Sequence, residues 1–196
     1  MKKLALLGAL VLAAPLAAMA APETYVIDPI HSYPHFAVDH LGVSTTRGRF
    51  DKMSGTFTVD TAAKTGGVEL VIESASVSTG DRDKGARKRS RDEHLRGADF
   101  FNVAEFPKMS YKSTAVKFNG DVPVEVQGQL TLLGVSKPVT LKIERWVCKD
   151  HPFRKKPMCG GDASGSFKRT DFGMKYGVPA IGDVVALFIG FEGYKQ

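Results

Sequence analysis

The chain has 196 residues, of which 43% are hydrophobic, and a formal net charge of +6 at pH 7. This length and apolar content support one domain with a sizeable core, and we expect no second domain. The charge is only mildly basic, so it does not by itself single out nucleic acid as a partner.

The first twenty residues have the three parts of a secretory signal peptide. Lys2 and Lys3 precede an apolar run, Leu4–Ala14, and a tail of small residues ends at Ala20. The run of about eleven residues is far shorter than the roughly 20 needed to cross a bilayer, which disfavours the alternative of an uncleaved anchor. We therefore predict cleavage after Ala20 and a periplasmic or secreted domain of residues 21–196. Without the two lysines, 25 basic and 21 acidic residues leave a net charge of +4.

Most of the remaining chain alternates apolar and polar residues with a period of two, as a half-buried strand requires. The longest run extends from Val122 to Leu132, and turn residues separate it from shorter runs. Many short strands at hairpin spacing predict an all-β domain with an antiparallel sheet that is rolled up or stacked. The shorter runs are Phe57–Val59, Val68–Ile72, Met109–Ser113, Val139–Ile143 and Val185–Phe191.

One charged segment, Lys84–Phe101, interrupts this pattern. Ser90 with Glu93 three positions later matches a capping box, which predicts a short helix beginning near Ser90 within a crossover between strands. The basic run Lys84–Arg91 could contact phosphates, but export disfavours nucleic acid. The alternatives are a solvated crossover and transient contact with an anionic membrane surface.

The last predicted strand, Val184–Phe191, is apolar on both faces. Such a strand suits two apolar environments, the core on one side and a ligand cavity or partner on the other. A strand buried between sheet and helix, or in a dimer contact, would give the same pattern.

Two cysteines, Cys148 and Cys159, lie close together in the sequence. In an oxidising exported compartment such a pair favours a disulfide over a metal site or a catalytic couple. We expect the bond to stabilise the proline-containing loop between them.

No constellation typical of catalysis or metal binding is present in the sequence. His31, His35 and His40 are close together and His94 could join them, but on one strand His40 would face away from the other two. Neither a zinc-type Cys/His cluster nor a G-x-S-x-G elbow occurs. The acidic residues at positions 81–99 alternate with arginines and are expected to pair with them. We therefore predict neither metal ligands nor catalytic residues.

Several motifs resemble, in the right order, those of the YceI-like family of exported lipid-binding proteins, also called polyisoprenoid-binding proteins. The likeness runs from about Thr24 to the C-terminus. The chain departs from the family pattern at Pro34, where an aliphatic residue is usual, and in the loop from Cys148 to Cys159, which many members lack. The motifs are Asp28-Pro29-Ile30-His31-Ser32, His40-Leu41-Gly42-Val43-Ser44, Gly48-Arg49-Phe50, Ser78-Thr79-Gly80, Arg91-Asp92-Glu93-His94-Leu95, Asp99-Phe100-Phe101, Phe106-Pro107, Gly128–Val135 with Lys137-Pro138, and Arg169–Met174.

The resemblance implies a lipocalin-like antiparallel β-barrel of about eight strands, with a short helix in a crossover and an interior able to hold one small ligand. It implies a long-chain apolar lipid as the ligand, such as a polyisoprenoid, a quinone or a fatty-acid derivative, and no catalytic cofactor. A homodimer and a membrane partner of the cytochrome b561 type are further implications of the resemblance.

The resemblance also suggests which residues contact the ligand. At its motif positions, Phe36, Phe50, Phe100, Phe101, Phe172 and Met174 are cavity candidates, with His40 and Arg169 as polar candidates. The alternation argument adds Leu132 and Phe188. His31, Arg91, Asp92, His94 and Asp171 are expected at the mouth or in structural roles. In the structural alternative, Arg91 and Arg169 pair with Asp92 and Asp171 and pin the helix and the barrel end.

Together these features predict an exported binding or carrier protein for a long-chain lipid rather than an enzyme. Two alternatives stay open at this point. One is a lipid-modifying isomerase or hydrolase that uses the same cavity, and the other is an accessory partner of a membrane cytochrome b561.

Overall fold

The computed structural model describes residues 21–196, so the expected signal peptide lies outside the described residues. Strands dominate the described part of the chain, as the alternation predicts. The elements in order are β1 (Glu23–Ile27), β2 (Tyr33–His40), β3 (Ser44–Phe50), β4 (Met53–Asp60), β5 (Thr65–Glu73), a 3-10 turn (Ser74–Ser76), β6 (Val77–Ser78), α1 (Arg91–Arg96), β7 (Lys108–Asn119), β8 (Val122–Leu132), β9 (Val135–Asp150), β10 (Pro157–Lys168), a second 3-10 turn (Arg169–Phe172) and β11 (Ile181–Lys195).

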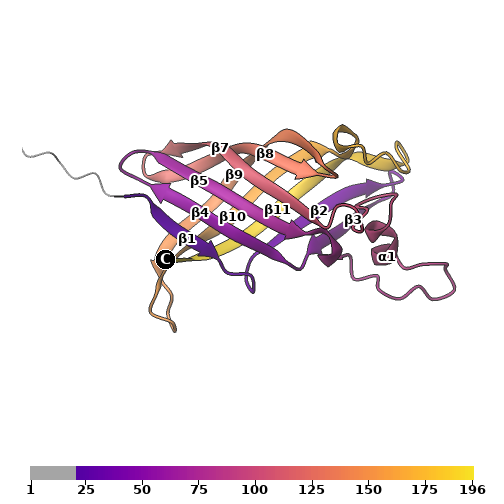
Figure 1. Ribbon diagram of the computed structural model, residues 1–196, viewed down its shortest axis with the longest axis horizontal. Helices are drawn as coiled ribbons and strands as arrows, with labels where there is room; N and C mark the ends of the chain where they lie inside the picture. Colours follow the sequence, from indigo (N-terminus) through magenta and orange to yellow (C-terminus); the bar gives the residue numbers. More distant parts are fainter. Residues whose placement is uncertain (1–20) are drawn as a thin grey trace, which may run out of the picture.

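Eight of these strands close into an antiparallel barrel (Figure 1). Their order around the barrel is β1, β4, β5, β7, β8, β9, β10 and β11, and β1 pairs with β11 to complete the circle. Closure leaves the barrel strands paired on both sides, which removes the open edges of a flat sheet. The predicted fold class, a barrel of about eight strands with a short helix in a crossover, is confirmed.

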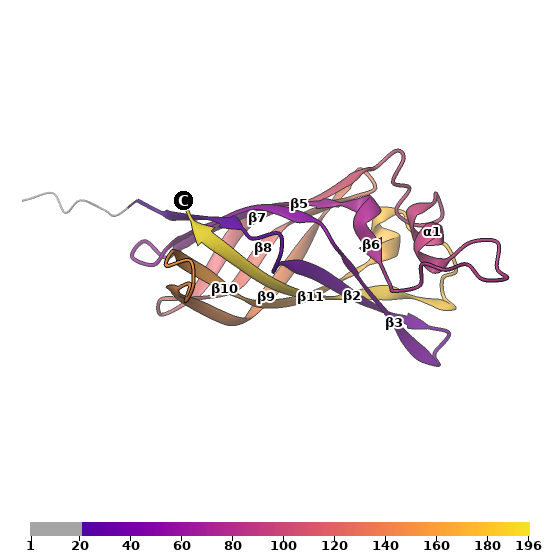
Figure 2. The ribbon, with the colours of Figure 1, turned by 90° about the horizontal axis from the view of Figure 1, so that it is seen from below.

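The long strand β11 has two successive neighbours along one edge. Its last residues pair with β1, whereas its earlier part, Ile181–Gly190, pairs with β2. The chain bends between β1 and β2, so β2, β3 and β6 extend the sheet beyond the closed part and lie near α1 (Figure 2). The barrel therefore has two unlike ends. We call them the helix end and the hairpin end. The helix end contains residues 79–107 with α1, and the hairpin end contains residues 149–156, which are the last two residues of β9 and the turn to β10.

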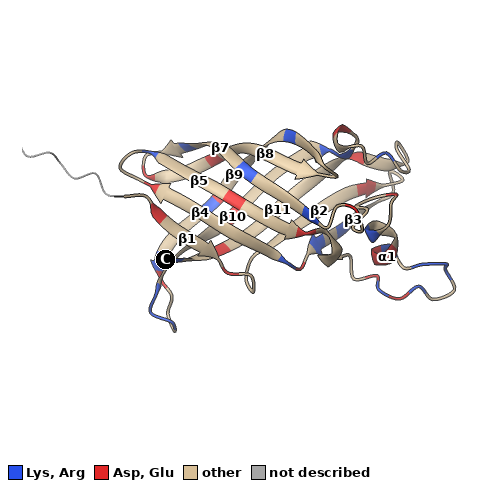
Figure 3. Ribbon diagram, viewed as in Figure 1, with Lys and Arg blue, Asp and Glu red and all other residues tan. Residues whose placement is uncertain are grey.

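The period-two pattern places alternate side chains inside the barrel. Val126, Leu130 and Leu132 of β8 are buried, as are Met109 and Tyr111 of β7. Charged residues occur along the strands and in the loops at both ends (Figure 3). The predicted strands are thus confirmed, and their inward residues form the core.

The second apolar face of β11 meets neither a cavity nor a covering element. Val184 and Phe188 on this face are 54% and 53% exposed. Val185 of the opposite face is buried in the core. Within residues 21–196 this face is therefore not the wall of a ligand cavity, and its cover by a partner or in a dimer contact stays a prediction.

The predicted helix is α1, and Ser90 is its N-cap. The Ser90 hydroxyl accepts a bond from the Glu93 N–H (3.1 Å), and the Glu93 carboxylate accepts one from the Ser90 N–H (2.7 Å). Asp92 is fully buried, and its Oδ1 accepts bonds from the backbone N–H and the hydroxyl of Thr79 at 2.8 and 2.7 Å. The capping box starts this helix, and Asp92 ties it to the beginning of the crossover.

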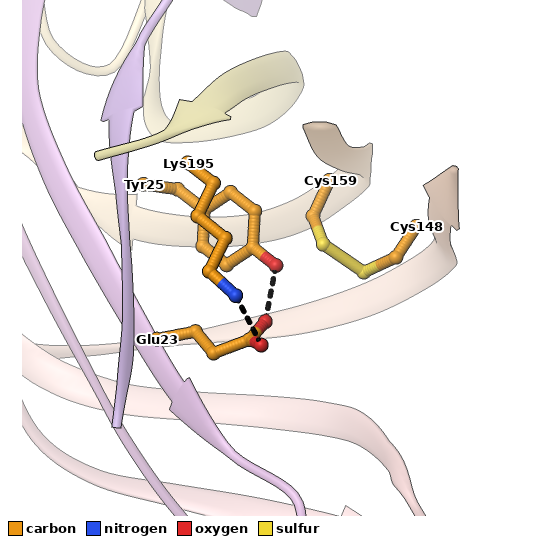
Figure 4. The surroundings of a disulfide bond; sticks show 5 residues. All are labelled: Glu23, Tyr25, Cys148, Cys159 and Lys195. Carbon is orange, nitrogen blue, oxygen red and sulfur yellow. Dashed lines mark hydrogen bonds and ion pairs between the residues drawn. A yellow bond between two sulfur atoms is a disulfide. The ribbon is translucent and has the colours of Figure 1, made fainter. Parts of the chain in front are cut away.

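The expected disulfide joins Cys148 and Cys159, which face each other on β9 and β10 with their Cα atoms 4.1 Å apart. The seam between β1 and β11 lies beside it (Figure 4). There the Glu23 carboxylate accepts bonds from Lys195 Nζ and from the Tyr25 hydroxyl, both at 2.6 Å. The bond from Lys195, followed by that from Tyr25, lowers the pKa of Glu23.

Of the helices within residues 21–196, none is long and apolar enough to cross a membrane.

Candidate ligand-binding site

A cavity of about 460 Å³ lies inside the barrel at the helix end. Ligand pockets for small molecules typically have volumes of about 300–1,000 Å³ and mostly apolar walls. Inward side chains of most barrel strands, of β2 and of β3 form the wall, and residues of the crossover complete it. The apolar lining residues are Pro34, Phe36, Val38, Phe50, Met53, Leu70, Ile72, Leu95, Phe100, Phe101, Met109, Leu130, Leu132, Val139, Leu141, Phe167, Met174, Ile181, Val185, Leu187 and Ile189.

The cavity wall contains basic residues and no acidic ones. The basic residues are Arg87, Arg89, Arg91, Arg169, His40 and His94, and no Asp or Glu is among the lining residues of the described chain. The side chains of Arg87, Arg89 and Arg91 are about half exposed, so the cavity reaches solvent beside the crossover. We call this opening the mouth.

Carboxylates outside the cavity hold the mouth arginines in place. Both guanidinium Nη atoms of Arg87 donate to Asp81 at 2.7 Å, and Arg89 donates to Asp99 at 3.0 Å. His94 Nε2 lies 2.8 Å from the same Asp99 carboxylate. The bond from His94, followed by that from Arg89, lowers the pKa of Asp99. The mouth is therefore preorganised by acids that do not face the ligand space.

Arg169 also lines the cavity and is only 2% exposed. Its guanidinium donates to the backbone carbonyls of Gly182 (2.8 Å), Ile181 (2.9 Å) and Met174 (3.1 Å). Burial lowers the pKa of Arg169, and the nearby Asp183 carboxylate acts in the opposite direction. Arg169 thus joins the start of β11 to the preceding loop and still presents its side chain to the cavity.

Aromatic side chains fill the barrel interior at the hairpin end. The Phe57 ring stacks on Tyr25 with a centroid distance of 5.0 Å and meets Trp146 and Phe191 edge-on at 5.7 and 5.8 Å. A second cavity of only about 70 Å³ lies among them. The two cavities share the lining residues Leu70, Leu141 and Ile189, so these side chains separate the wide space from the narrow one.

Tyr111 is placed near this boundary by a glycine. A Cβ on Gly128 would lie 2.5 Å from the Tyr111 ring, so only glycine lets the ring lie against β8. The Tyr111 hydroxyl then donates to the carbonyls of Val126 (3.1 Å) and Val139 (3.0 Å). Burial raises the pKa of Tyr111, which keeps its hydroxyl protonated as a donor.

The structure brings most of the predicted ligand-binding residues together at the large cavity. The predicted residues that line it are Phe36, His40, Phe50, Phe100, Phe101, Leu132, Arg169 and Met174. Arg91 and His94, expected at the mouth or in structural roles, also line it.

The prediction that Phe188 lines the cavity is wrong. Leu187 and Ile189 line it, so the alternation of β11 points Phe188 outward, where it is 53% exposed. Phe172 was also placed wrongly, because it lies behind the cavity wall. It is 2% exposed and packs edge-on against Phe167, which does line the cavity, at a centroid distance of 5.2 Å.

The predicted pairing of arginines with neighbouring acids has the wrong partners. Arg91 lies 3.9 Å from Asp81 rather than beside Asp92, and Arg169 binds backbone carbonyls while Asp171 is exposed. Asp92 has a structural role through Thr79. The pinning of the barrel end by Arg169 is nevertheless as expected.

His31 lies away from the cavity, in the bend between β1 and β2. Its Nδ1 is 2.8 Å from the buried Asp28 carboxylate, and Asp28 also accepts a bond from the Ile30 N–H at 3.0 Å. Glu192 adds a second carboxylate, with an oxygen within 4.8 Å of these ligand atoms. The bonds from His31 and Ile30 give Asp28 partners within its own bend, so we assign this cluster a structural role.

Sequence reasoning missed several cavity residues. Tyr111, Leu141 and Leu187 lie within predicted strands, and the inward parity of those strands could have identified them. Arg87 and Tyr176 come from irregular segments, which carry no periodic signal. Only the tertiary fold brings these two side chains to the mouth.

The model of the YceI-like domain matches residues 25–192. Curated relatives named Protein YceI from Escherichia coli O157:H7 and Salmonella arizonae are each 37% identical over 167 residues, which cover 85% of this chain and 83% of each relative.

Solved structures share the fold. Burkholderia cenocepacia BcnA superposes with a TM-score of 0.68 at 21% identity, covering 85% of this chain and 98% of that chain. A Campylobacter jejuni YCEI protein gives 0.66 at 25% identity, covering 81% and 90%. A polyisoprenoid binding domain from Saccharophagus degradans gives 0.61 at 19% identity, covering 88% and 98%. The resemblance seen in the motifs is confirmed, and the chain belongs to the family of YceI-like domain proteins.

Proposed function

We propose that this protein is an exported carrier that holds one long-chain apolar lipid, such as a polyisoprenoid, a quinone or a fatty-acid derivative, inside its barrel. The observation that carries the proposal is the cavity of about 460 Å³, whose wall is mostly apolar and includes arginines and histidines but no Asp or Glu of the described chain. The polyisoprenoid binding domain of Saccharophagus degradans, which shares the fold, supports the same ligand class.

The physical basis is the transfer of the lipid tail out of water. Each buried methylene contributes about 0.8 kcal/mol, so a five-carbon isoprene unit contributes about 4 kcal/mol before the cost of ordering the chain. A long tail thus binds without specific polar contacts.

The test is to purify the exported protein from whole cells without detergent and to extract it with organic solvent for mass spectrometry. We expect lipid in a near-stoichiometric amount. A barrel that is empty after native purification would contradict the proposal.

A pair of substitutions assigns the lipid to the cavity. Leu132→Trp puts a large ring into the ligand space and should lower the bound lipid at least about tenfold, because it displaces several methylenes. Phe188→Trp makes a similar change on the outer face of β11 and should leave the lipid content unchanged. Equal lipid in both variants would place the ligand outside the barrel.

The proposed export rests on residues 1–20, which have the composition of a signal peptide. Fractionation of cells followed by N-terminal sequencing should find a periplasmic or secreted protein that begins at Ala21. A protein that retains Met1 in the cytoplasm would contradict the proposed localisation and the origin of the disulfide.

The alternative of a lipid-modifying enzyme needs an acid/base pair or a nucleophile in the cavity. Ser90 lines it, but its hydroxyl caps α1, and His94 is held by Asp99. His94→Gln distinguishes the two functions. A carrier with this substitution would still exchange its lipid, whereas an enzyme with it would bind the lipid and leave it chemically unchanged.

Two other expectations need their own tests. Pull-down from the membrane fraction would test the cytochrome b561 partner, and sedimentation would test the homodimer.

A further inference from the structure

The turn between β9 and β10 forms a protruding surface at the hairpin end of the barrel. We call residues 149–156 the basic hairpin tip. The ribbon views place it at the opposite end of the molecule from α1 (Figures 1 and 2), whose residues line the cavity. Phe153 at this tip is 89% exposed, the highest fraction among the exposed large hydrophobic residues of the described chain.

The tip carries positive charge that other side chains do not neutralise. Its basic residues are Lys149, Arg154, Lys155 and Lys156, against one acidic residue, Asp150 (Figure 3). In residues 21–196 none of these four cations takes part in an ion pair within 4.0 Å.

The other basic segment, at the mouth, is different. Arg87, Arg89 and Arg91 all lie within 4.0 Å of a carboxylate, so that only Lys84 and Lys88 of the run Lys84–Arg91 have no ion pair among the described residues. Of the two basic segments, the hairpin tip therefore has more unpaired cations, and they lie beside Phe153, the most exposed of the large hydrophobic residues in residues 21–196.

Internal contacts hold the tip in one conformation. His151 Nδ1 accepts hydrogen bonds from the backbone N–H groups of Phe153 (3.2 Å) and Arg154 (3.0 Å). The backbone N–H of His151 donates to the Lys156 carbonyl (2.9 Å). The Arg154 guanidinium lies over the Tyr194 ring, 5.0 Å from its centroid. The Cys148–Cys159 disulfide joins the two strands at the base of the tip (Figure 4). Phe153 is thus presented outward by a prearranged loop, which lowers the entropy lost on binding.

We propose that the basic hairpin tip docks on the surface of an anionic phospholipid bilayer. Phe153 enters the boundary between head groups and acyl chains, and the three lysines contact lipid phosphates. One aromatic ring with a few cations gives reversible, salt-sensitive binding rather than stable anchoring. Docking through this end directs the cavity mouth away from the bilayer. The proposal does not depend on which lipid, if any, the barrel holds.

Vesicle sedimentation tests the docking. The oxidised protein of residues 21–196, which contains every strand of the barrel, should bind vesicles of phosphatidylglycerol and phosphatidylcholine at low salt, and bind phosphatidylcholine alone far more weakly. A basic residue near an anionic surface contributes about 1 kcal/mol, which corresponds to about a fivefold change in affinity. Replacing Lys149, Lys155 and Lys156 with Gln should therefore weaken binding on the order of a hundredfold, and Phe153→Ser about tenfold.

The matched control lies at the helix end, where Val43 in the β2–β3 turn is 85% exposed. Val43→Ser, and the pair Lys84→Gln and Lys88→Gln, should leave binding unchanged. All substituted side chains are exposed, so an unchanged melting temperature should accompany each effect.

Fluorescence reports which end meets the lipid. The chain has a single tryptophan, Trp146, whose signal in the unsubstituted protein can be subtracted. Phe153→Trp should shift its emission to the blue when anionic vesicles are added, and Val43→Trp should not. A shift only in Val43→Trp would show that the mouth end docks and would overturn the proposal, as would the absence of vesicle binding by the unsubstituted protein.

Discussion

The two halves of the barrel interior share most of their strands but differ in what they enclose. At the helix end, the inward side chains leave a cavity of about 460 Å³, whereas at the hairpin end Phe57 packs against other aromatic rings and the space left is only about 70 Å³. Leu70, Leu141 and Ile189 lie at the boundary and face both spaces.

This difference separates stability from binding within one fold. Packed aromatic rings stabilise a core through area burial and edge-on contacts, and they leave no room for a ligand. The wall of the wide half, which contains both aliphatic and aromatic side chains, faces open space, so it loses part of that packing and gains a binding site. Substitutions at the two ends should therefore have different effects, and four predictions test this from the largest expected effect to the smallest.

The aromatic half is expected to contribute most to stability. Phe57 is 5% exposed and contacts Tyr25, Trp146 and Phe191. Phe57→Ala should lower the free energy of unfolding by about 3–5 kcal/mol, since it leaves a cavity in a packed core. Urea denaturation measures this change. A loss below about 1 kcal/mol would show that the aromatic half is not the better-packed one.

At the mouth, Arg169 is expected to stabilise the wide half. Arg169→Met removes three hydrogen bonds to carbonyls and should cost on the order of 3 kcal/mol, because the carbonyls of Met174, Ile181 and Gly182 lose their donor. The same substitution at the adjacent exposed Lys168 is the control and should change stability little. If both variants unfold at the same urea concentration, the loop at this end does not depend on Arg169.

The disulfide should matter chiefly at the hairpin end. Cys148 and Cys159 are separated by 11 positions, and closing so short a loop restricts the unfolded chain by about 3 kcal/mol at most in the entropy model. Replacing both with Ala should lower unfolding stability by up to that amount. Hydrogen exchange should increase around residues 148–159 and change little at the mouth. Increased exchange throughout the mouth would contradict this local effect.

The smallest expected effect concerns pH and the pair of His31 and Asp28. The bond to Asp28 raises the pKa of His31 above its ordinary value of 6.5. For Asp28, burial acts to raise the pKa, but the bonds from His31 and the Ile30 N–H outweigh it and lower the pKa below 3.8. The pair therefore stabilises the fold fully between about pH 3.8 and 6.5.

Above pH 6.5 this contribution is lost as the pH rises through the raised pKa of His31, and at low pH it is lost as Asp28 becomes protonated. His31 is about half exposed, so the contribution should stay below about 1 kcal/mol. Thermal melting of the unsubstituted protein and of His31→Gln should differ most near pH 5–6 and converge at alkaline pH. A difference that grows with pH would have the wrong sign for this pair.

The sequence predicted the local features that depend on near neighbours. Alternation in Val122–Leu132 identified a strand, and the spacing of Ser90 and Glu93 identified the start of α1. The motif aromatics Phe36, Phe50, Phe100 and Phe101 were expected at the cavity, and the structure places them there. These signals are readable because alternation and capping depend on positions only two or three residues apart.

The wrong predictions concern the face of a strand on which a side chain lies, or contacts between residues that are not adjacent in the sequence. Phe188 lies in an apolar strand but one position out of phase with the cavity, and Phe172 is separated from it by Phe167. Arg169 binds carbonyls that lie 5 to 13 positions further along the chain, so its partners could not be taken from the adjacent acids.

The sequence by itself determined an all-β domain, its strands, the capped helix and the family. Only the tertiary structure decided that β1 and β2 share one edge of β11, that the interior is wide at one end and packed at the other, and that the basic residues of the hairpin tip stay without ion pairs. The reason is physical. Secondary structure follows from local periodicity, whereas the size of a cavity and the pairing of charges depend on side chains that closure of the barrel brings together.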